Sequence, residues 1–422
     1  MGKPKIRFKG YEDDWEQRKL GEIYGSIGNA FVGTATPYYV EQGHFYLESN
    51  NVKDGQINHN SEIFINDEFY EKQKDKWLHT GDVVMVQSGH VGHAAVIPKE
   101  LNNTAAHALI MFRNPKEEIE PYFLNYEYQT DKVKKKIENI TTGNTIKHIL
   151  ASDMQEFVVD VPKYEEQKVI ASYFSHLDHL ITLHQRKCEE TKSLKKYMLQ
   201  KMFPENGNCV PKIRFSGFAD AWEQRKLGDV LVSLQNNTLS RADLSKEIGV
   251  AKNVHYGDVL IKFGEVLDVS KEKLPMILDE NVLTKYNASF LQNGDVIVAD
   301  TAEDSTVGKC SEIAGLIDEV VLSGLHTIPY RPVEKFASGY LGYYLNSNAY
   351  HHQLIPLMQG IKVTSISKSA MQDTGIIYPK LIEEQAKIGT YFQSLDHLIT
   401  LHQHKCDELQ KLKKFMLQNM FV

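Results

Sequence analysis

Three groups of side chains in this chain have residue types and spacing suited to chemistry, and the first is acidic. Asp160 is followed by Glu166-Gln167-Lys168, a carboxylate pair with a nearby lysine that could hold a metal ion and activate water in a nuclease. The corresponding place later in the chain reads Glu384-Gln385-Ala386, without the lysine. The acids also stand where a helix is expected to begin, and they stabilise the helix dipole there. Helix capping is therefore favoured over a nuclease site.

The second group contains two histidines and two cysteines at helical spacing. His184 and Cys188 are four residues apart, as are His402 and Cys406, so each pair would share one helix face. If the two helices ran antiparallel, the four side chains could form a tetrahedral zinc site. Packing or hydrogen bonding among these side chains is the favoured alternative, and we expect no bound metal.

The third group is basic and polar, and it points to nucleic acid. Four lysines within residues 132–136 precede a loop at 141–148, where Gly143 lets the backbone approach a phosphate. Polar loops at 50–53 and 88–93 carry side chains able to read base edges, although solvated loops and a solvated helix face are the alternative. The candidate DNA-binding residues are Asn50, Asn51, Lys53, Ser88, His90, His93, Lys134, Lys135, Asn144, Thr145, Lys147, His148, Lys362, Thr364, Ser365 and Lys368.

The last four of these candidates come from a second loop, which differs from the first in sequence. Gly360-Ile361-Lys362-Val363 stands where the first loop has Gly143-Asn144-Thr145-Ile146, so its hydrogen-bond donors are not repeated. The loop after Gly294-Asp295-Val296, another place where the two halves align, is also acidic and contains Asp300, Glu303 and Asp304. Carboxylates repel a phosphate, but one of them could accept a hydrogen bond from a cytosine amino group.

Composition limits what these groups can do. The 422 residues carry 48 Lys and Arg against 55 Asp and Glu, a formal charge of -7, which by itself does not suggest a binder of polyanions. Residues 131–148 are nevertheless locally basic.

The sequence contains no phosphate-binding loop, dinucleotide fingerprint, zinc-protease or serine-hydrolase motif. The four cysteines lie far apart, and no apolar run is long enough to span a bilayer, so we expect a cytoplasmic protein without membrane contact.

An internal repeat must position these groups. Trp15-Glu16-Gln17-Arg18-Lys19-Leu20-Gly21 recurs at 222–228, each time after Pro-Lys-Ile-Arg-Phe, and residues 165–203 recur at 383–421 with about two-thirds identity. The segments between the repeats, roughly 22–160 and 229–378, align only at scattered points. Two copies of one scaffold, each with its own insert, indicate two different recognition surfaces held in one geometry.

The inserts are predicted to be α+β. Short apolar runs at 82–86, 94–97, 109–112 and 295–299 are bounded by turn residues and predict strands. Residues 122–137 and 340–355 each predict one helix.

The repeated 39-residue segment predicts a long helix of roughly 58 Å with an apolar seam at heptad spacing. Since a whole insert separates the two copies, an antiparallel coiled coil with an internal pseudo-twofold repeat is the simplest packing. The predicted seam residues are Ile170, Phe174, Leu177, Ile181, Ile388, Phe392, Leu395 and Ile399.

The order of insert, helix, insert and helix resembles the specificity subunits of type I restriction-modification enzymes. The residues that carry the resemblance include the repeated motif opening at Trp15, Tyr46 to Gly55, Gly81-Asp82-Val83-Val84, Thr142 to Ile149 and the entry to the helix at 162–167. Together they cover essentially the whole chain. The resemblance implies target recognition domains at 1–162 and 205–379, a central spacer helix at 163–204 and a C-terminal spacer helix at 380–422.

The resemblance also implies a function without catalysis by this chain. Each recognition domain would read one half of a split, asymmetric double-stranded DNA target in the major groove, and the helices would set the gap. Two modification subunits would methylate adenine with S-adenosylmethionine, and restriction subunits would use ATP and Mg; no cofactor would be bound by this chain. The alternative is a duplicated coiled-coil scaffold whose inserts bind proteins. Salt distinguishes the two, because DNA affinity falls steeply as salt rises.

Overall fold

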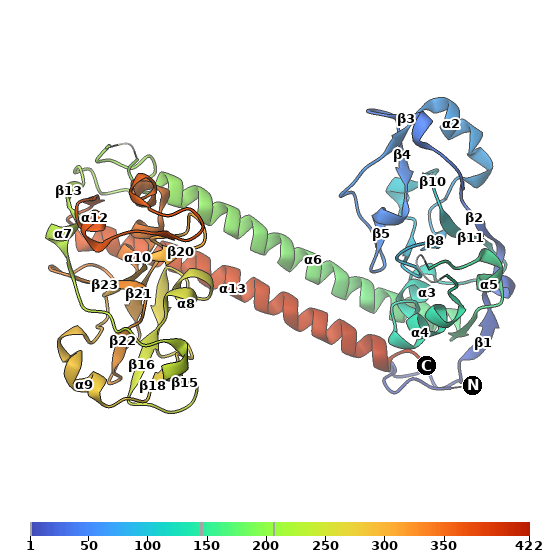
Figure 1. The fold of residues 1–422 in the computed structure, drawn as a ribbon. Coiled ribbons are helices and arrows are strands. Elements are labelled where there is room, and N and C mark those ends of the chain that lie inside the picture. The colour runs from blue at the N-terminus through green and yellow to red at the C-terminus, as the bar shows by residue number, and fades with distance from the viewer. Residues whose placement is uncertain (1, 144–146, 206) are drawn as a thin grey trace. The chain divides into compact units, whose positions relative to one another are not determined.

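The computed structural model describes residues 2–143, 147–205 and 207–422. The chain divides into two units: unit 1 is formed by Met1–Gln185 and His404–Val422, and unit 2 by Arg186–Gln403. Each unit contains one insert and a part of each long helix (Figure 1). The four segments proposed from the sequence are consecutive stretches of the chain, and each long helix is a segment of its own. The two units instead split each long helix between them, so they do not test the proposed boundaries, which stay predictions.

Unit 1 is built around a four-stranded antiparallel sheet in the order β2-β11-β8-β9, and a second four-stranded sheet has the order β10-β4-β7-β3. All four residues of β8 are buried because both faces of this strand are covered. The predicted strands at 82–86, 94–97 and 109–112 are confirmed as β8, β9 and β11. The strands of unit 1 are β1 (Glu16–Lys19), β2 (Tyr24–Asn29), β3 (Tyr39–Val40), β4 (His44–Leu47), β5 (Val52–Lys53), β6 (Gln56–Ile57), β7 (Phe64–Ile65), β8 (Val83–Val86), β9 (Ala94–Val96), β10 (Ala105–Ala106), β11 (Leu109–Pro115) and β12 (Val158–Val161).

Unit 2 has a five-stranded sheet in the order β14-β23-β19-β21-β17 and a four-stranded sheet in the order β15-β18-β16-β22. The predicted strand at 295–299 is confirmed as β19, which is wholly buried. The strands of unit 2 are β13 (Glu223–Lys226), β14 (Leu231–Ser233), β15 (Leu244–Ser245), β16 (Ala251–Val254), β17 (Val266–Asp268), β18 (Met276–Ile277), β19 (Val296–Ala299), β20 (Thr301–Ala302), β21 (Cys310–Ala314), β22 (Val321–Ser323), β23 (Thr327–Pro332), β24 (Thr364–Ser365) and β25 (Gly375–Tyr378).

The prediction of one helix in each of two segments is wrong, because both helices are broken by hydroxyl side chains. The Thr130 hydroxyl donates to the carbonyl of Glu127 and accepts from the amide of Val133, so it ends one helix and caps the next. The Ser347 hydroxyl donates to the carbonyl of Tyr344 at the equivalent break. The short helices of the chain are α1 (Leu20–Ile23), α2 (Asp67–Lys72), α3 (Pro121–Glu127), α4 (Asp131–Ile140), α5 (Ala151–Gln155), α7 (Leu227–Val230), α8 (Tyr256–Ile261), α9 (Asn281–Lys285), α10 (Tyr340–Asn346), α11 (Asn348–His351) and α12 (Lys368–Gln372).

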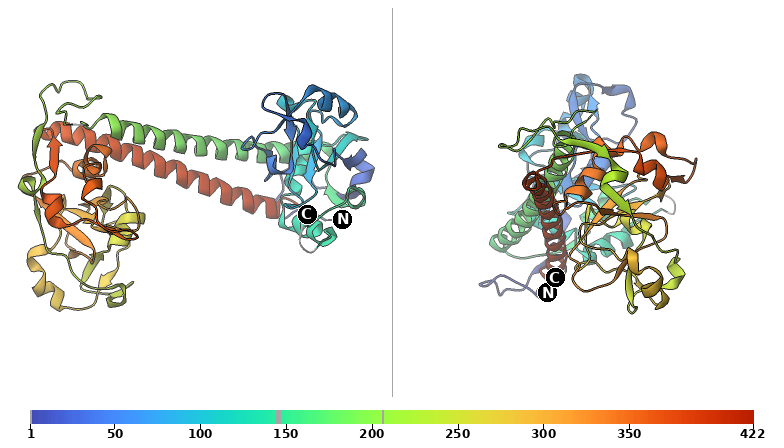
Figure 2. Two further views of the ribbon diagram at one scale, coloured as in Figure 1. Left: turned by 45° about the horizontal axis from the view of Figure 1, so that its top comes forward. Right: turned by 90° about the vertical axis from the view of Figure 1, so that its left-hand side faces the viewer.

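The two predicted long helices are α6 (Tyr164–Lys201) and α13 (Ile382–Asn419), and they pair antiparallel (Figure 2). In unit 1 the start of α6 packs on the end of α13, with Phe174 and Phe421 ring centroids 5.8 Å apart. In unit 2 the end of α6 packs on the start of α13, where the rings of Phe203 and Phe392 stack at 5.8 Å. Of the eight seam residues, seven are buried and Ile399 is half-buried.

Each unit places one lysine of the seam in an ion pair. In unit 1, Lys413 of α13 reaches Asp178 of α6 at 2.6 Å, and the Tyr126 hydroxyl donates to the same carboxylate. In unit 2, Lys195 of α6 reaches Asp396 of α13 at 2.6 Å, and Tyr343 takes the place of Tyr126. Lys195 also reaches Glu265 at 2.9 Å. A shift of one long helix along the other would separate Lys413 from Asp178 and Lys195 from Asp396, so these two pairs favour this antiparallel register.

The repeated Pro-Lys-Ile-Arg-Phe motif ties the helix ends together. In unit 1 the amide of Ile6 donates to the carbonyl of Asn419 at the end of α13, and Arg7 pairs with Glu166 at the start of α6. In unit 2 the Arg214–Glu384 pair repeats this arrangement, with the motif bound to the end of α6. The motif is thus a clamp that fixes the end of one long helix to the start of the other.

Candidate nucleic-acid interface

Two predicted loops of unit 1 lie side by side. The loop at 87–93 follows β8, and the hairpin at 142–148 is closed by two backbone hydrogen bonds between Thr142 and His148. Ser88 forms a β-bridge with His148, and the amide of Gly89 donates to the carbonyl of Lys147. The candidates Asn144 and Thr145 lie outside the described residues. Predicted residues from two distant segments therefore meet at one edge of the unit.

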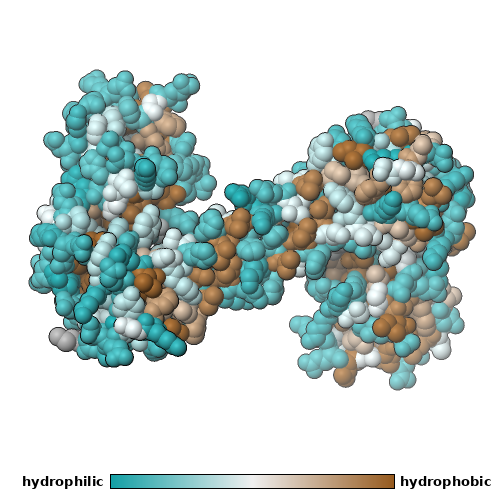
Figure 3. Space-filling model, turned by 180° about the vertical axis from the view of Figure 1, so that it is seen from behind, coloured by the Kyte–Doolittle hydropathy of each residue, from teal (hydrophilic) through white to brown (hydrophobic). Residues whose placement is uncertain are grey.

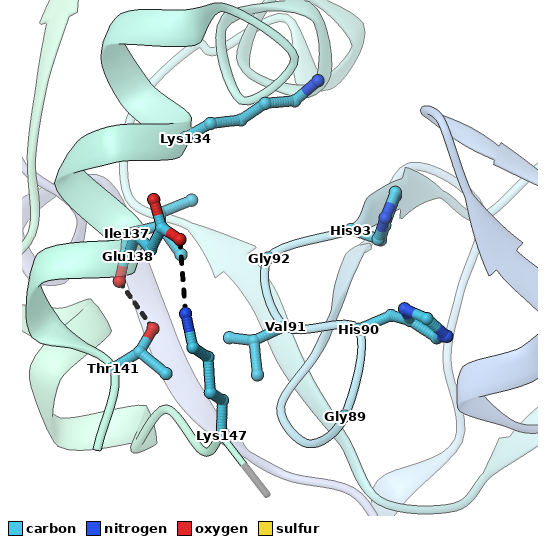
Figure 4. A pocket seen from close by; sticks show the side chains of 10 residues that line it. All are labelled: Gly89, His90, Val91, Gly92, His93, Lys134, Ile137, Glu138, Thr141 and Lys147. Atoms are coloured by element: carbon cyan, nitrogen blue, oxygen red, sulfur yellow. Dashed lines mark hydrogen bonds and ion pairs between the residues drawn. The ribbon is translucent and has the colours of Figure 1, made fainter. Parts of the chain in front are cut away.

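A cavity of about 390 Å³ opens between these loops and α4. Four predicted residues contribute to its lining: His90, His93, Lys134 and Lys147. Figure 4 shows Lys134 on α4 and Lys147 on the hairpin, with His90 and His93 on the loop after β8. Lys147 also contacts Glu138 at 3.2 Å, an acidic lining residue that the sequence did not single out. Ammonium and imidazole groups around a cavity of this kind can hold an anion such as a phosphate.

The structure separates the four lysines of α4 into two pairs. Lys132 and Lys136 both reach the buried carboxylate of Asp160, at 3.1 and 3.9 Å. Lys134 and Lys135 are exposed, and within the described part of the chain they form no ion pair. Only the second pair has its charge free for a ligand, and these two are the lysines named as candidates.

His93 is held as a neutral donor at this edge. The backbone amide of Asp54 donates to its Nδ1 at 3.2 Å, so the ring proton sits on Nε2. Burial lowers the pKa of His93, and the nearby positive charges of Lys134, His90 and Lys53 lower it further, against the opposite effect of Asp54. A negative phosphate among these groups would favour protonation of the ring.

The loop at 50–53 contributes differently from what its sequence suggests. Asn51 is 1% exposed, and its amide group bonds to the backbones of Glu48, Asn58 and Ser61. This side chain shapes the loop, so we do not retain it as a base-reading candidate. Asn50 and Lys53 are exposed, and Lys53 is one of the positive charges that lower the pKa of His93.

Unit 2 repeats the hairpin backbone despite its different sequence. Gln359 and Ser365 exchange two backbone hydrogen bonds of 2.9 and 2.8 Å, as Thr142 and His148 do in unit 1. Gly360 has φ of 115° and Gly143 has φ of 100°, which suits glycine at this turn. The candidates Lys362, Ser365 and Lys368 are exposed and Thr364 is half-buried. The two units therefore present equivalent hairpins with different side chains.

Glu166 and Cys188, two of the side chains considered for nuclease or zinc chemistry, have partners within the fold. Glu166, the acid considered for a nuclease, is 1% exposed and receives two hydrogen bonds from Arg7. The single hydrogen of the Cys188 thiol has two acceptors within reach, the carbonyl of Ile399 at 3.9 Å and Oε1 of Gln403 at 3.7 Å. In the described ranges no group of three or more His, Cys, Asp or Glu is arranged to hold a metal ion.

The long helices also carry exposed apolar side chains outside the seam. Leu194 and Tyr197 of α6 are 44% and 51% exposed in unit 2, and Leu412 and Phe415 of α13 are 42% and 55% exposed in unit 1. These pairs occupy the same positions of the repeat, and we call each an outer face. Figure 3 shows brown apolar patches between teal hydrophilic residues along the helices. The outer faces were not predicted from the sequence, although both repeat copies are apolar or aromatic at these positions.

No helix within the described residues is both long and apolar enough to cross a membrane.

The fold is that of an internally duplicated protein. Each unit has an equivalent hairpin beside the paired long helices, and so each half offers one candidate recognition surface. Comparison with known proteins identifies the family to which this duplicated protein belongs. The type I restriction modification DNA specificity domain matches residues 12–193 and again residues 219–411. The chain belongs to this family, whose members are the non-catalytic DNA-recognition subunits of type I restriction-modification systems.

Individual relatives agree over nearly the full length. The chain is 23% identical over 419 residues to the type I restriction enzyme MjaVIII specificity subunit of Methanocaldococcus jannaschii, covering 95% of this chain and 91% of that protein. The putative MjaX specificity subunit of the same organism is also 23% identical, with the same coverage. Among solved structures, the S subunit of the type I restriction-modification system from M. genitalium superimposes with a TM-score of 0.59 at 13% identity, covering 100% of this chain and 99% of that one. At 13% identity, the similarity of the two structures establishes a shared fold and nothing further.

Proposed function

We propose that each unit reads one half of a bipartite, asymmetric DNA target through its hairpin and the neighbouring loops. The observation that carries this proposal is the repeated closure of the hairpin: both units have the same pair of backbone hydrogen bonds and a glycine of positive φ, but different closing side chains. In unit 1 the contacts would come from His90, His93, Lys134 and Lys147, with Lys135, Lys53 and His148 close by. In unit 2 they would come from Lys362 and Lys368 with Thr364 and Ser365. A shared backbone with different side chains suits two different half-sites in one complex.

Removing one free lysine tests this interface. Lys134→Ala should weaken DNA binding by the complete complex about equally for all sequences, and it should reduce the slope of log affinity against log salt by about one. The methylated motif should stay the same, because phosphate contacts carry no base information. Lys99→Ala is the matched control, since this exposed lysine lies beyond the other end of β9. An unchanged salt slope for Lys134→Ala would remove this lysine from the interface.

Two modification subunits would dock on the outer faces, one on each. Leu194 with Tyr197 and Leu412 with Phe415 offer the same apolar pair in each repeat, so two copies of one partner can bind equivalently. Tyr197→Lys and Phe415→Lys should each reduce the stoichiometry from two modification subunits to one, and the double variant should bind none. Mass measurement of the assembled complex reads this directly. Lys187→Ala and Lys411→Ala, exposed changes on the same helices, are controls that should still bind two.

The remaining chemistry would belong to the partners. S-adenosylmethionine would be used by the modification subunits to methylate adenine, and ATP and Mg by restriction subunits, with no cofactor on this chain. The four cysteines are free thiols, which supports a reducing compartment and the cytoplasm. Purified chain should neither methylate nor cleave DNA, and adding the modification subunits should give sequence-specific adenine methylation. Methylation with the same pattern by modification subunits alone would refute this division of labour.

A further inference from the structure

Unit 2 contains a second cavity, of about 500 Å³, on one side of its hairpin. Its walls come from four places: residues 233–236 at and after the end of β14, Asp300 between β19 and β20, residues 327–329 of β23, and residues 366–368 between β24 and the start of α12. Backbone hydrogen bonds fix these walls, because the amide of Ile366 donates to the carbonyl of Asp300 and the amide of Gln235 donates to the Ser289 hydroxyl. The cavity is therefore a preformed part of the recognition edge.

Two polar side chains of this cavity keep hydrogen-bonding capacity for a ligand. Gln235 is exposed, and its side-chain amide makes no hydrogen bond within the described residues. Asp300 uses Oδ1 to accept from the Thr301 hydroxyl at 2.7 Å and faces His326 at 3.5 Å. Its Oδ2 has no partner in the described ranges. Asn236, by contrast, is held by its bond to the carbonyl of Gly324.

The cavity lining includes one carboxylate, from Asp300, and one ammonium group, from Lys368, and the carboxylate decides what can bind beside Gln235. A phosphate carries only acceptors and a negative charge, so the carboxylate of Asp300 repels it. An amino group is a donor and suits that carboxylate. In the major groove, adenine offers an amino donor at N6 beside an acceptor at N7, which a glutamine amide matches with two hydrogen bonds. Guanine and thymine place the acceptors O6 and O4 where adenine and cytosine have amino groups.

We propose that this cavity reads one adenine of the half-site recognised by unit 2, with Gln235 as the specificity-determining side chain. Asp300 strengthens the choice by repelling the oxygen that guanine or thymine would place at the position of the adenine amino group. Lys368, an exposed lysine at the edge of the cavity, contacts a neighbouring phosphate and adds affinity without selectivity. The inference rests on the proposed division of the DNA target between the two units.

Sequencing of methylated adenines in cells that carry the complete system tests the assignment. Gln235→Ala should relax one position, an adenine in wild type, within one half-site, with the other half-site unchanged as an internal folding control. Asp300→Asn should admit guanine or thymine at that position, since the amide can donate to their oxygens. Lys368→Ala should lower methylation at all sites but keep the motif. Gln42→Ala, an exposed glutamine in a turn of unit 1, should change nothing.

A base analogue sharpens the test for the purified complex. Replacing the assigned adenine by 7-deazaadenine removes the N7 acceptor and should weaken binding by wild type roughly 10-fold. The same replacement should leave the affinity of the Gln235→Ala complex unchanged. Exchanging residues 22–160 for the insert of another family member identifies the half-site that unit 1 reads. An unchanged motif for Gln235→Ala, or relaxation in that half-site, overturns the inference alone. A wild-type motif without two halves would instead overturn the proposed function.

Discussion

Arg7→Ala should destabilise unit 1 far more than a surface substitution. Arg7 donates to both oxygens of Glu166, with Nε to Oε1 at 2.7 Å and Nη2 to Oε2 at 2.8 Å. The side chains are 12% and 1% exposed, so the variant leaves a buried carboxylate without its partner. Breaking a buried pair on one side costs about 3–5 kcal/mol, whereas an exposed pair contributes about 0–1 kcal/mol. We therefore expect a loss of about 3 kcal/mol or more.

The repeat supplies a matched comparison in unit 2. Arg214 holds Glu384 in the same way, but there the indole N–H of Trp222 also donates to the carboxylate at 3.2 Å. This remaining donor should make Arg214→Ala milder than Arg7→Ala by about 1 kcal/mol. Hydrogen-exchange mass spectrometry across a urea series reads the two units separately. Losses below about 1 kcal/mol for both variants would refute the reasoning from burial, and equal losses would refute the role of Trp222.

Two further variants test buried charges. Burial raises the pKa of Glu127 from its ordinary value of 4.5 to about 8, so the stability that the neutral carboxyl gives is complete below pH 4.5 and is lost as the pH rises toward 8. Glu127→Gln stays neutral, and urea titrations should find it equal to wild type at pH 4.5 but more stable by about 2 kcal/mol or more at pH 8; a constant difference would contradict the burial effect. Lys413→Met should cost about 3 kcal/mol, the lower end of the range for a broken buried pair, because it strands Asp178 with the Tyr126 hydroxyl as a remaining donor. Thermal unfolding should show partial recovery when Asp178→Asn is added. No recovery would mean that lost packing, and not charge, sets the cost.

The sequence predicted the elements with strong periodic patterns. The seam pattern located the long helices to within a few residues, because apolar residues kept at heptad spacing over many turns line up on one face only in a helix. Apolar runs bounded by turn residues located β8, β9, β11 and β19, because a short buried segment between two turns has room for a strand. The breaks after Glu127 and before Asn348 were missed, because a single threonine or serine can bond a helix carbonyl or point to solvent, and only the neighbouring backbone decides between them.

The sequence predicted that the candidate site binds DNA and which loops form it, but not which side chains of those loops are available to a ligand. The sequence by itself determined the duplication, the antiparallel helices and the loops that differ between the halves, since these follow from identity and spacing along the chain. Only the tertiary structure decided that Asp160 neutralises Lys132 and Lys136 while Lys134 stays free, that Asn51 is a buried loop support, and that Gln235 shares a cavity with Asp300. These outcomes depend on which side chains from distant segments come within hydrogen-bonding distance, and the spacing of residues in one segment carries no information about partners in another.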